Sequence, residues 1–219
     1  MENTIVYLIR HSIRFDTDLI KTYNTSQNSI LKNEKVILSV EGEKRAEILS
    51  NQTELQNIDI VYASNCVRTL QTAKYLLEKQ SLDVNIDERF DERRIGKTNY
   101  DEEKNWYKLQ FTDENYKTEG GESQIEVRNR FSEAFNEVIE QNKGKRIAIF
   151  THGVAIAFFL LKWCKLEDIT EKKLRISFNG RIVADKRINA PDVFKIILDD
   201  NNEPVEITNI EFDDLPQKY

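Results

Sequence analysis

The chain has 219 residues, of which 38 are acidic and 32 are Lys or Arg, so its formal net charge at neutral pH is -6. This balance argues against a polybasic nucleic-acid-binding protein, and the low content of 7 Gly and 3 Pro argues against a collagenous or low-complexity chain. The 2 Cys are too few for a disulfide framework, so we expect reduced thiols and a cytoplasmic protein.

Strand-like and helix-like segments alternate through the first part of the chain. The strand-like runs are rich in apolar residues, as expected for strands that are covered on both faces. The helix-like runs follow capping side chains, Ser39 for the first helix and Ser64-Asn65 for the second. In chain order we expect a strand at 4–9, a helix from Ser39 through Leu49, a strand at 58–62, a helix over 67–77 and a short strand at 84–86.

The second part of the chain begins with a polar insertion and ends in a β-like pattern. The insertion, Lys97–Glu119, carries five aromatic residues that we expect to pack on an amphipathic cap helix. Gly120-Gly121 breaks the chain before a long helix that Gly144 ends. We then expect a strand at 147–150, a helix at 154–163, strands at 174–178 and 181–188 joined by an Asn179-Gly180 hairpin turn, a strand at 193–198 and a polar turn at 199–203.

The most apolar stretch of the chain, residues 147–161, predicts a buried strand and helix and not a membrane span. It is shorter than the ~20 residues that a span needs, and it contains the ionisable side chain of His152. The N-terminus has neither a basic region nor a small-residue cleavage site, so we expect no secretion signal. We therefore expect no membrane partner.

This alternation predicts an α/β fold with three layers, α/β/α, around a mainly parallel central sheet. Neither a repeat nor a Pro/Gly-rich linker is present, so we expect one catalytic domain over 1–219, with 97–119 as a cap-like insertion. Ligands of such sheets bind beyond the carboxyl ends of the strands. The only two histidines, His11 and His152, each follow a predicted strand, and we expect both at this edge.

Four short motifs fall at this predicted edge. A histidine after a strand is by itself as often a structural residue as a functional one. Arg68 carries more information, because a basic residue in the first turn of a helix is unfavourable unless an anion is bound there. The motifs are Arg10-His11, Ser64 to Ala73 with Arg68, Phe90 to Gly96 with Glu92, and Thr151-His152-Gly153.

The four motifs follow one another in the order typical of the histidine phosphatase superfamily. The chain resembles this superfamily, in particular its phosphoglycerate-mutase-like branch. The shared motifs cover about residues 4–165, and Leu38-Ser39-x-x-Gly42 and Gly120-Gly121-Glu122-Ser123 match two further signatures. The resemblance implies a phosphoglycerate-mutase-like fold and a hydrolase that forms a phosphohistidine. It implies no cofactor. The two His and two Cys are too widely separated to predict a metal site.

The chemistry of phosphoryl transfer assigns roles to the residues that carry the resemblance. His11 is the expected nucleophile, and it must attack through a neutral ring nitrogen. We therefore expect a nearby backbone carbonyl to accept the other ring N–H. Arg10, Arg68 and His152 are expected to surround the phosphoryl oxygens, together with the amide groups of the helix that follows His152.

The resemblance also implies that Glu92 is the general acid. It gives a proton to the leaving alkoxide, and the same carboxylate can then activate water. Glu88 is the second choice for this role. We interpret two neighbouring acidic residues, Asp91 and Glu122, as solvated or helix-capping carboxylates, and Cys66 as a small buried residue.

Three positions after His11 depart from the common pattern of the branch. Ser12 stands where Gly is usual, and Thr17 stands where the branch commonly has a phosphate-binding Asn. Arg14 instead matches a motif of the acid-phosphatase branch. We expect Ser12 and Arg14 as candidate phosphate ligands, with a surface position as the equal alternative for Arg14. The Asp that the acid-phosphatase branch has after its second His is missing here, which keeps Glu92 as the acid.

We expect a phosphomonoester hydrolase that acts on a small phosphorylated metabolite. A bisphosphoglycerate-dependent phosphoglycerate mutase is the alternative, but it needs extra cationic residues. The insertion has no Arg and more acidic residues than Lys, so Arg93 and Arg94 are the only obvious residues that could supply the extra positive charge. A phospholigand-binding module without catalysis is the third interpretation. The sequence predicts no nucleic-acid partner, and it defines neither the substrate nor the oligomeric state.

Overall fold

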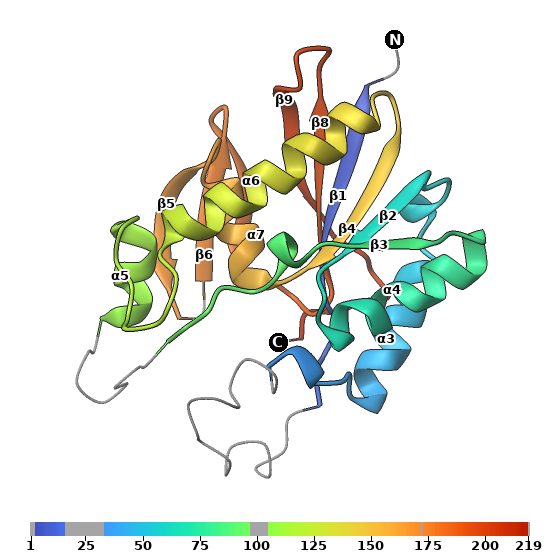
Figure 1. Ribbon diagram of the computed structural model, residues 1–219, viewed down its shortest axis with the longest axis horizontal. Coiled ribbons are helices and arrows are strands. Elements are labelled where there is room, and N and C mark those ends of the chain that lie inside the picture. Colours follow the sequence, from blue (N-terminus) through green and yellow to red (C-terminus); the bar gives the residue numbers. More distant parts are fainter. Residues whose placement is uncertain (1–2, 16–32, 97–104, 172, 219) are drawn as a thin grey trace.

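A six-stranded sheet occupies the centre of the fold in the computed structural model, which describes residues 3–15, 33–96, 105–171 and 173–218 (Figure 1). The neighbouring strands β3, β2, β4 and β1 pair in parallel, whereas β8 is antiparallel to both β1 and β9. This arrangement confirms the predicted mainly parallel sheet. In spatial order the strands are β3 (Val84–Ile86), β2 (Ile60–Ala63), β4 (Arg146–Thr151), β1 (Thr4–Arg10), β8 (Asp192–Leu198) and β9 (Pro204–Ile210).

Helices cover both faces of this sheet, as the alternation of β1 side chains requires. Val6 and Leu8 point into a core that α6 (Gln124–Gln141) and α7 (Gly153–Leu160) cover. Tyr7 and Ile9 point into a second core, under α3 (Val40–Ser50) and α4 (Val67–Gln80). Figure 1 shows these two helix layers on either side of the strands. The predicted three-layer α/β/α architecture is confirmed.

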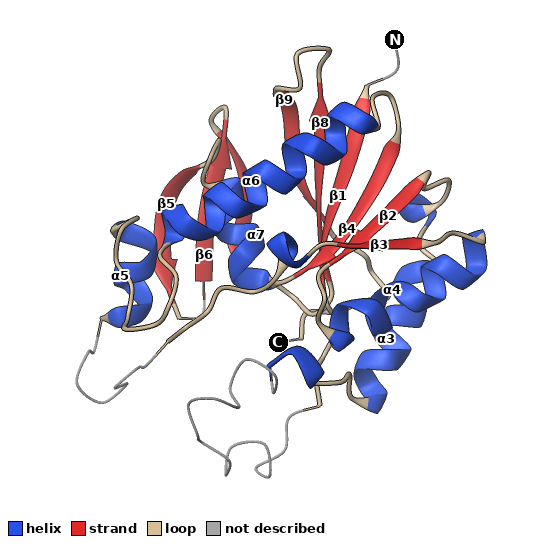
Figure 2. Ribbon diagram, viewed as in Figure 1, coloured by secondary structure: helices blue, strands red, loops and turns tan. Residues whose placement is uncertain are grey.

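A second, antiparallel sheet follows α7 (Figure 2). Its strands are β5 (Lys165–Thr170), β6 (Lys173–Phe178) and β7 (Arg181–Lys186). The predicted hairpin joins β6 to β7, and both Asn179 and Gly180 have the positive φ angles that a tight hairpin turn of this type requires. β5 and β9 were not predicted, because neither alternates clearly between buried and exposed residues.

Serine side chains cap the starts of two helices, as was predicted for Ser39 but not for Ser123. Ser39 Oγ accepts a hydrogen bond from the Gly42 amide at 3.0 Å, and Ser123 forms a capping box with Glu126. The helix expected from residue 67 is confirmed as α4, but its expected cap at Ser64-Asn65 is wrong. That helix begins after Cys66, whose side chain makes no capping hydrogen bond, and Ser64 has another partner in the candidate site.

The insertion contains one described helix, α5 (Trp106–Thr112). Phe111 is buried and its ring lies 5.1 Å from that of Phe158 in α7, in agreement with a packing role. Thr17 and the first part of the insertion lie outside the described residues. None of the described helices combines the length and the apolarity that crossing a membrane would require.

The segment that follows β1 is held tightly against the start of α3. The carbonyl oxygen of Ile13 accepts hydrogen bonds from the backbone N–H of Ser39 at 2.9 Å and from its hydroxyl at 3.2 Å. A Cβ atom on Gly42 would lie only 2.0 Å from the same oxygen. The glycine therefore allows the close approach that fixes residues 12–15 over the sheet edge.

We predict that Gly42→Ala lowers the free energy of unfolding by about 1–3 kcal/mol, because the added methyl group must displace the Ile13 carbonyl. Chemical denaturation of the two proteins measures the effect. Lys44→Ala, at an exposed position of the same helix, is the matched control and should change stability little. Equal stability of Gly42→Ala and the unsubstituted protein would contradict this account of the contact.

Candidate active site

Residues that follow three neighbouring strands meet at one edge of the central sheet. β2, β4 and β1 are adjacent and parallel, and Ser64, His152 and His11 come directly after them. The backbone N–H of His11 donates to the Thr151 carbonyl at 2.9 Å, and that of Ser64 donates to the Phe150 carbonyl at 3.0 Å. The two histidine rings lie 5.2 Å apart, centroid to centroid. The structure thus brings both histidines to the predicted edge.

The ring of His11 is buried and its tautomer follows from its one hydrogen bond. Its Nδ1 lies 2.7 Å from the carbonyl oxygen of Ser12. A carbonyl can only accept, so Nδ1 carries the proton and Nε2 keeps its lone pair. Burial, followed by the charges of Arg68 and Arg10, holds the pKa of His11 well below 6.5. The expected neutral imidazole, tied to a backbone carbonyl, is present.

His152 is also buried and neutral, but with the opposite tautomer. Arg68 donates a guanidinium N–H to its Nδ1 at 3.0 Å, so Nε2 carries the proton and donates to Ser64 Oγ at 2.8 Å. The Ser64 hydroxyl lies 3.0 Å from the hydroxyl of Thr69. Burial, and then the charges of Arg68 and His11, lower the pKa of His152 well below 6.5. Ser64 therefore orients His152 and does not cap α4.

Arg68 is a buried cation without a carboxylate partner among the described residues. Its side chain is 2% exposed, and it donates to the carbonyl and side-chain oxygens of Asn33 as well as to His152. Its Nε has no hydrogen-bond partner in the described part of the chain. Burial lowers the pKa of Arg68. A buried guanidinium with an unused donor is suited to an anion.

Arg10 is partly buried and crosses the start of α7. It donates to the carbonyl oxygens of Ile188 at 2.5 Å and Asn189 at 3.2 Å, and its Nε has no partner within the described ranges. A Cβ atom on Gly153 would lie 3.2 Å from that Nε, so the glycine leaves room for the guanidinium. Burial lowers the pKa of Arg10 to about 10, against the raising effects of Glu92 and Asp192.

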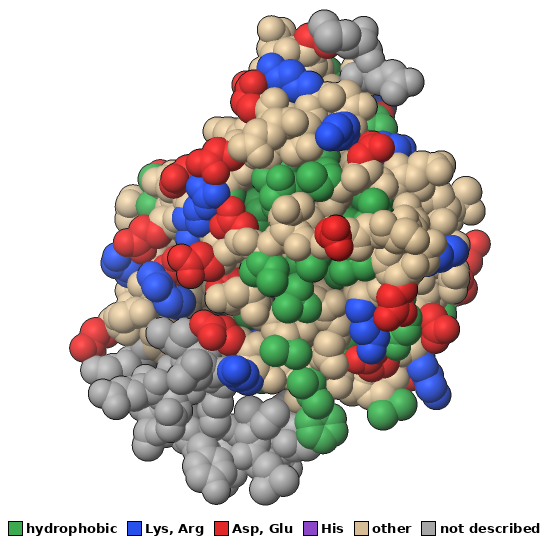
Figure 3. All heavy atoms as spheres, turned by 45° about the vertical axis from the view of Figure 1, so that its right-hand side comes forward, with side chains coloured by type: hydrophobic (Ala, Val, Ile, Leu, Met, Phe, Trp, Pro, Cys, Tyr) green, Lys and Arg blue, Asp and Glu red, His purple; other side chains and the backbone are tan. Residues whose placement is uncertain are grey.

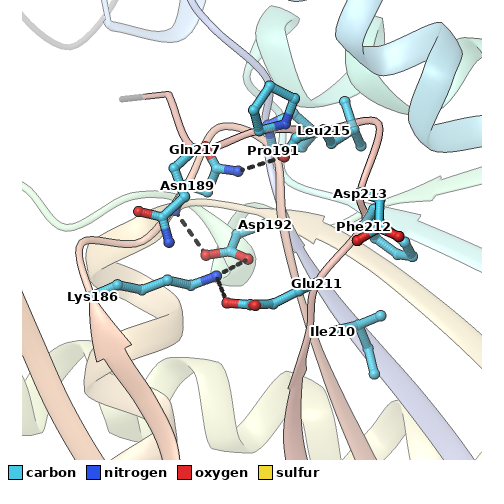
Figure 4. A pocket seen from close by; sticks show the side chains of 11 residues that line it. Lys186, Asn189, Pro191, Asp192, Ile210, Glu211, Phe212, Asp213, Leu215 and Gln217 are labelled. Carbon is cyan, nitrogen blue, oxygen red and sulfur yellow. Dashed lines mark hydrogen bonds and ion pairs between the residues drawn. The ribbon is translucent and has the colours of Figure 1, made fainter.

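The segment that holds Arg10 is itself fixed by a buried network. Arg45 donates to the carbonyl oxygen of Ala190 at 2.8 Å, and the Asn189 amide donates to Asp192 at 2.8 Å. A pocket beside this segment is lined in part by Asp192, Lys186 and Glu211, and Lys186 lies 2.9 Å from the Glu211 carboxylate (Figure 4). None of the predicted site residues lines this pocket.

Glu92 binds the N-terminus of the helix that follows His152. One carboxylate oxygen accepts from the amides of Arg93 at 2.9 Å and Ala155 at 3.0 Å, and the other accepts from Val154 at 3.3 Å. The side chain is thereby held in a fixed position next to Arg10, whose pKa it raises. In this structure the Val154 and Ala155 amides bind Glu92, whereas we expected them to face phosphate. Glu88, the second choice for the acid, is exposed.

Ser12 and Arg14 differ in their surroundings. Ser12 is fully buried, its amide donates to Thr72 Oγ1 at 2.9 Å, and its own hydroxyl has no partner among the residues that the structure describes. Arg14 is exposed, yet its charge lowers the pKa values of both His11 and Arg10. Both residues thus lie near His11, Ser12 as a buried hydroxyl and Arg14 as an exposed cation.

Two residues without an expected catalytic role, Asp91 and Cys66, lie beside His152. Asp91 is partly buried and accepts from the Asn65 amide at 3.1 Å, and burial raises its pKa to about 6. Cys66 is buried as expected, and burial raises the pKa of its thiol to about 11. The interpretation of Glu122 as a solvated carboxylate is wrong, because Glu122 is buried and pairs with Arg130 at 2.9 Å. Only the folded chain brings Asp91, Cys66 and His152 together.

Comparison with known proteins gives a consistent result. Residues 6–184 match the model of the family described as the histidine phosphatase superfamily, branch 1. A Yersinia enterocolitica protein named as phosphoglycerate mutase GpmB is 26% identical over 183 residues, which cover 78% of this chain and 80% of that protein.

Two solved structures share the fold at low identity. One, titled mycobacterial hydrolase 1, has a TM-score of 0.70 and 15% identity, and the match covers 96% of this chain and 100% of that chain. The other, a phosphoserine phosphatase from Entamoeba histolytica, has a TM-score of 0.60 and 17% identity. The match covers 94% of this chain and 96% of that chain.

We predict that Arg14→Ala weakens the binding of inorganic phosphate or vanadate by about tenfold or more. A charge-assisted hydrogen bond to an anion contributes on the order of 1.5–3 kcal/mol. Arg14→Lys should restore only part of the affinity, because an ammonium group cannot reproduce the bidentate geometry. Isothermal titration calorimetry measures both variants. Arg181→Ala, at an exposed position in the hairpin, is the control. Unchanged affinity in Arg14→Ala would show that the exposed Arg14 does not bind phosphate, and it would leave Ser12 as the candidate ligand.

Proposed function

The chain belongs to branch 1 of the histidine phosphatase superfamily and is a histidine-type phosphatase, and from this premise we propose that it hydrolyses small phosphomonoesters through a phosphohistidine on His11. The observation that carries the proposal is the hydrogen bond from His11 Nδ1 to the Ser12 carbonyl. It leaves Nε2 with a lone pair, at a sheet edge where Arg10 and Arg68 have no carboxylate partner among the described residues.

Binding of the substrate phosphate uses the donors that the protein leaves unused. The Nε groups of Arg10 and Arg68 and the hydroxyl of Ser12 are buried and have no partner in the described part of the chain. Two cations in a region that excludes water attract a dianion more strongly than they would in bulk solvent. The attraction is local, since acidic and basic side chains are interspersed over the face in Figure 3 and the net charge is -6.

In the first chemical step, His11 Nε2 attacks phosphorus. The N–P bond forms as the bond to the leaving oxygen breaks. Nδ1 keeps its proton and continues to donate a hydrogen bond to the Ser12 carbonyl. The developing charge on the phosphoryl oxygens is stabilised by Arg10 and Arg68, and His152 holds the Arg68 guanidinium in position through its Nδ1. Glu92, in its protonated form, gives a proton to the leaving alkoxide.

In the second step the phosphohistidine is hydrolysed. The Glu92 carboxylate takes a proton from water, the water oxygen attacks phosphorus, and the N–P bond breaks to restore neutral His11. The amides of Val154 and Ala155 hold that carboxylate in position for both steps. The enzyme returns to its starting state without a cofactor.

Mutase activity is the second candidate, because curated relatives are named as phosphoglycerate mutases. A mutase must hold a second anionic group on its substrate. Arg94 is paired with Glu122 at 3.6 Å, and the Arg93 guanidinium packs over the rings of Trp106 and Phe158. These contacts support hydrolysis as the main reaction. Phosphate release from a panel of phosphomonoesters, run beside a mutase assay with and without bisphosphoglycerate, separates the two reactions.

A phospholigand-binding module without catalysis would need neither the nucleophile nor the acid. Turnover of p-nitrophenyl phosphate distinguishes this interpretation from the enzymatic ones. We also propose that the enzyme acts in a reducing compartment, the cytoplasm, because Cys66 and Cys164 are free and buried.

We predict that His11→Ala abolishes turnover while the chain stays folded, because the covalent route is lost and His11, although buried, belongs to neither hydrophobic core. A trapped phosphoenzyme, mapped by mass spectrometry under conditions that preserve phosphohistidine, checks the prediction. The unsubstituted protein and Arg181→Ala should carry the label on His11, and His11→Ala should carry none. Label on any other residue would refute the assignment.

We predict that Glu92→Gln slows hydrolysis of alkyl phosphates by about 10²–10⁴-fold and slows hydrolysis of p-nitrophenyl phosphate far less. An alkoxide needs a proton in the transition state, whereas nitrophenolate largely does not. Steady-state kinetics with both substrates measure the difference. Glu88→Gln, four residues earlier, is the matched control. Equal losses on both substrates in Glu92→Gln, or a leaving-group-dependent loss in Glu88→Gln, would move the acid away from Glu92.

A further inference from the structure

Three potential metal ligands meet behind the candidate active site. The sulfur of Cys66, a carboxylate oxygen of Asp91 and a ring nitrogen of His152 all lie within 4.8 Å of one another. They come from the start of α4, the segment after the short 3-10 helix Glu88–Phe90, and the turn between β4 and α7. The phosphatase mechanism uses His152 but neither Cys66 nor Asp91.

The residue before Cys66 carries a further polar group that has no partner in the described part of the chain. The Asn65 amide donates to the Asp91 carboxylate at 3.1 Å, so Asn65 is next to the cluster. Its side-chain oxygen is buried and accepts no hydrogen bond from any described residue. A buried acceptor that is left unsatisfied costs free energy, and a carbonyl oxygen is a group that a divalent cation can bind.

The donor set is selective for one class of cation. A thiolate and an imidazole bind Zn²⁺ and Cd²⁺ strongly, whereas Mg²⁺ and Ca²⁺ prefer sites built from oxygen atoms. Ligand atoms around a tetrahedral zinc ion lie about 3.5 Å apart, so the three side chains would have to approach by about 1 Å. The two negative charges of Cys66 and Asp91 would balance the charge of the cation.

We propose that Cys66, Asp91 and His152 form a binding site for one Zn²⁺ ion, or a cation of the same class, and that its occupation inhibits the enzyme. Both ring nitrogens of His152 have partners, Ser64 at 2.8 Å and Arg68 at 3.0 Å. The cation must replace one of them. His152 then loses its contact with Ser64, or Arg68 loses the contact that fixes its position in the phosphate site.

The two halves of this proposal rest on different grounds. Binding rests on the cluster alone, whereas inhibition rests on the proposed phosphatase function. When the cation binds, the Cys66 thiol releases its proton to solvent and the sulfur donates a lone pair to the metal, so no oxidant or reductant is involved.

Binding is tested on the full chain, freed of metal by a chelator, with Cd²⁺ as a spectroscopic probe and Zn²⁺ in calorimetry. A cadmium thiolate has an ultraviolet charge-transfer band, and we expect it at a stoichiometry of one. Cys66→Ser should lose the band, and Cys164→Ala should keep it. The second variant is a matched control, because the chain has only 2 Cys and Cys164 lies in the core.

Asp91→Asn provides a second variant that does not depend on the thiol. The asparagine oxygen can still accept from the Asn65 amide, but it lacks the charge that binds the cation. We expect Zn²⁺ affinity to fall by about tenfold or more, since even outer-shell partners of metal ligands contribute about 10–100-fold. Both Cys66→Ser and Asp91→Asn should keep their basal activity and lose sensitivity to Zn²⁺.

The possible results are distinguishable. A band that persists in Cys66→Ser, or equal Zn²⁺ affinity in all variants, would overturn the site. Inhibition that Cys66→Ser does not relieve would overturn its regulatory role. If the protein shows no phosphatase activity while the band maps to Cys66, the proposed function fails and the metal site stands. If the protein shows phosphatase activity but no band appears, the metal site fails and the proposed function stands.

Discussion

The hydrogen bond from His11 Nδ1 to the carbonyl oxygen of Ser12 is the interaction on which the site depends. It selects the tautomer whose other nitrogen can attack phosphorus, and burial keeps that nitrogen unprotonated. The carbonyl points in the required direction because its segment is fixed on both sides. Thr72 binds the Ser12 amide, and Ile13 packs against Gly42 at a distance that only glycine permits. The start of α3 thereby sets the chemistry at the end of β1.

The electrostatics of the site follow from cations that are buried and have no anionic partner among the described residues. Arg10 and Arg68 donate mainly to backbone carbonyl groups and to His152, so their charges are positioned but not neutralised. Such an arrangement costs folding free energy, which an anionic ligand can offset on binding. Glu92 is the nearest counter-charge that raises the pKa of Arg10, and the α7 amides hold it. An acidic protein can therefore bind a phosphate dianion at this edge of the sheet.

Local patterns in the sequence predicted the sheet and its edge. The apolar run of β1, the cap at Ser39 and the Asn179-Gly180 turn are each encoded within a few residues. The positions of His11 and His152 followed from strand direction alone. Contacts between distant segments were not predictable in this way. Ser64 has capping chemistry, yet its hydroxyl is used by a histidine 88 residues away. The metal-ligand cluster and the helix-bound carboxylate of Glu92 likewise arise from segments that only the fold brings together.

The most direct test of the central claim is nitrogen NMR of the two histidines in ¹⁵N-labelled protein at neutral pH. The chain has only these two imidazoles, so their signals can be assigned with His11→Ala. The account predicts two neutral rings of opposite tautomer, with the proton on Nδ1 of His11 and on Nε2 of His152. A charged His11, or a His11 ring that carries its proton on Nε2, would contradict it, because neither form has the lone pair that must attack phosphorus.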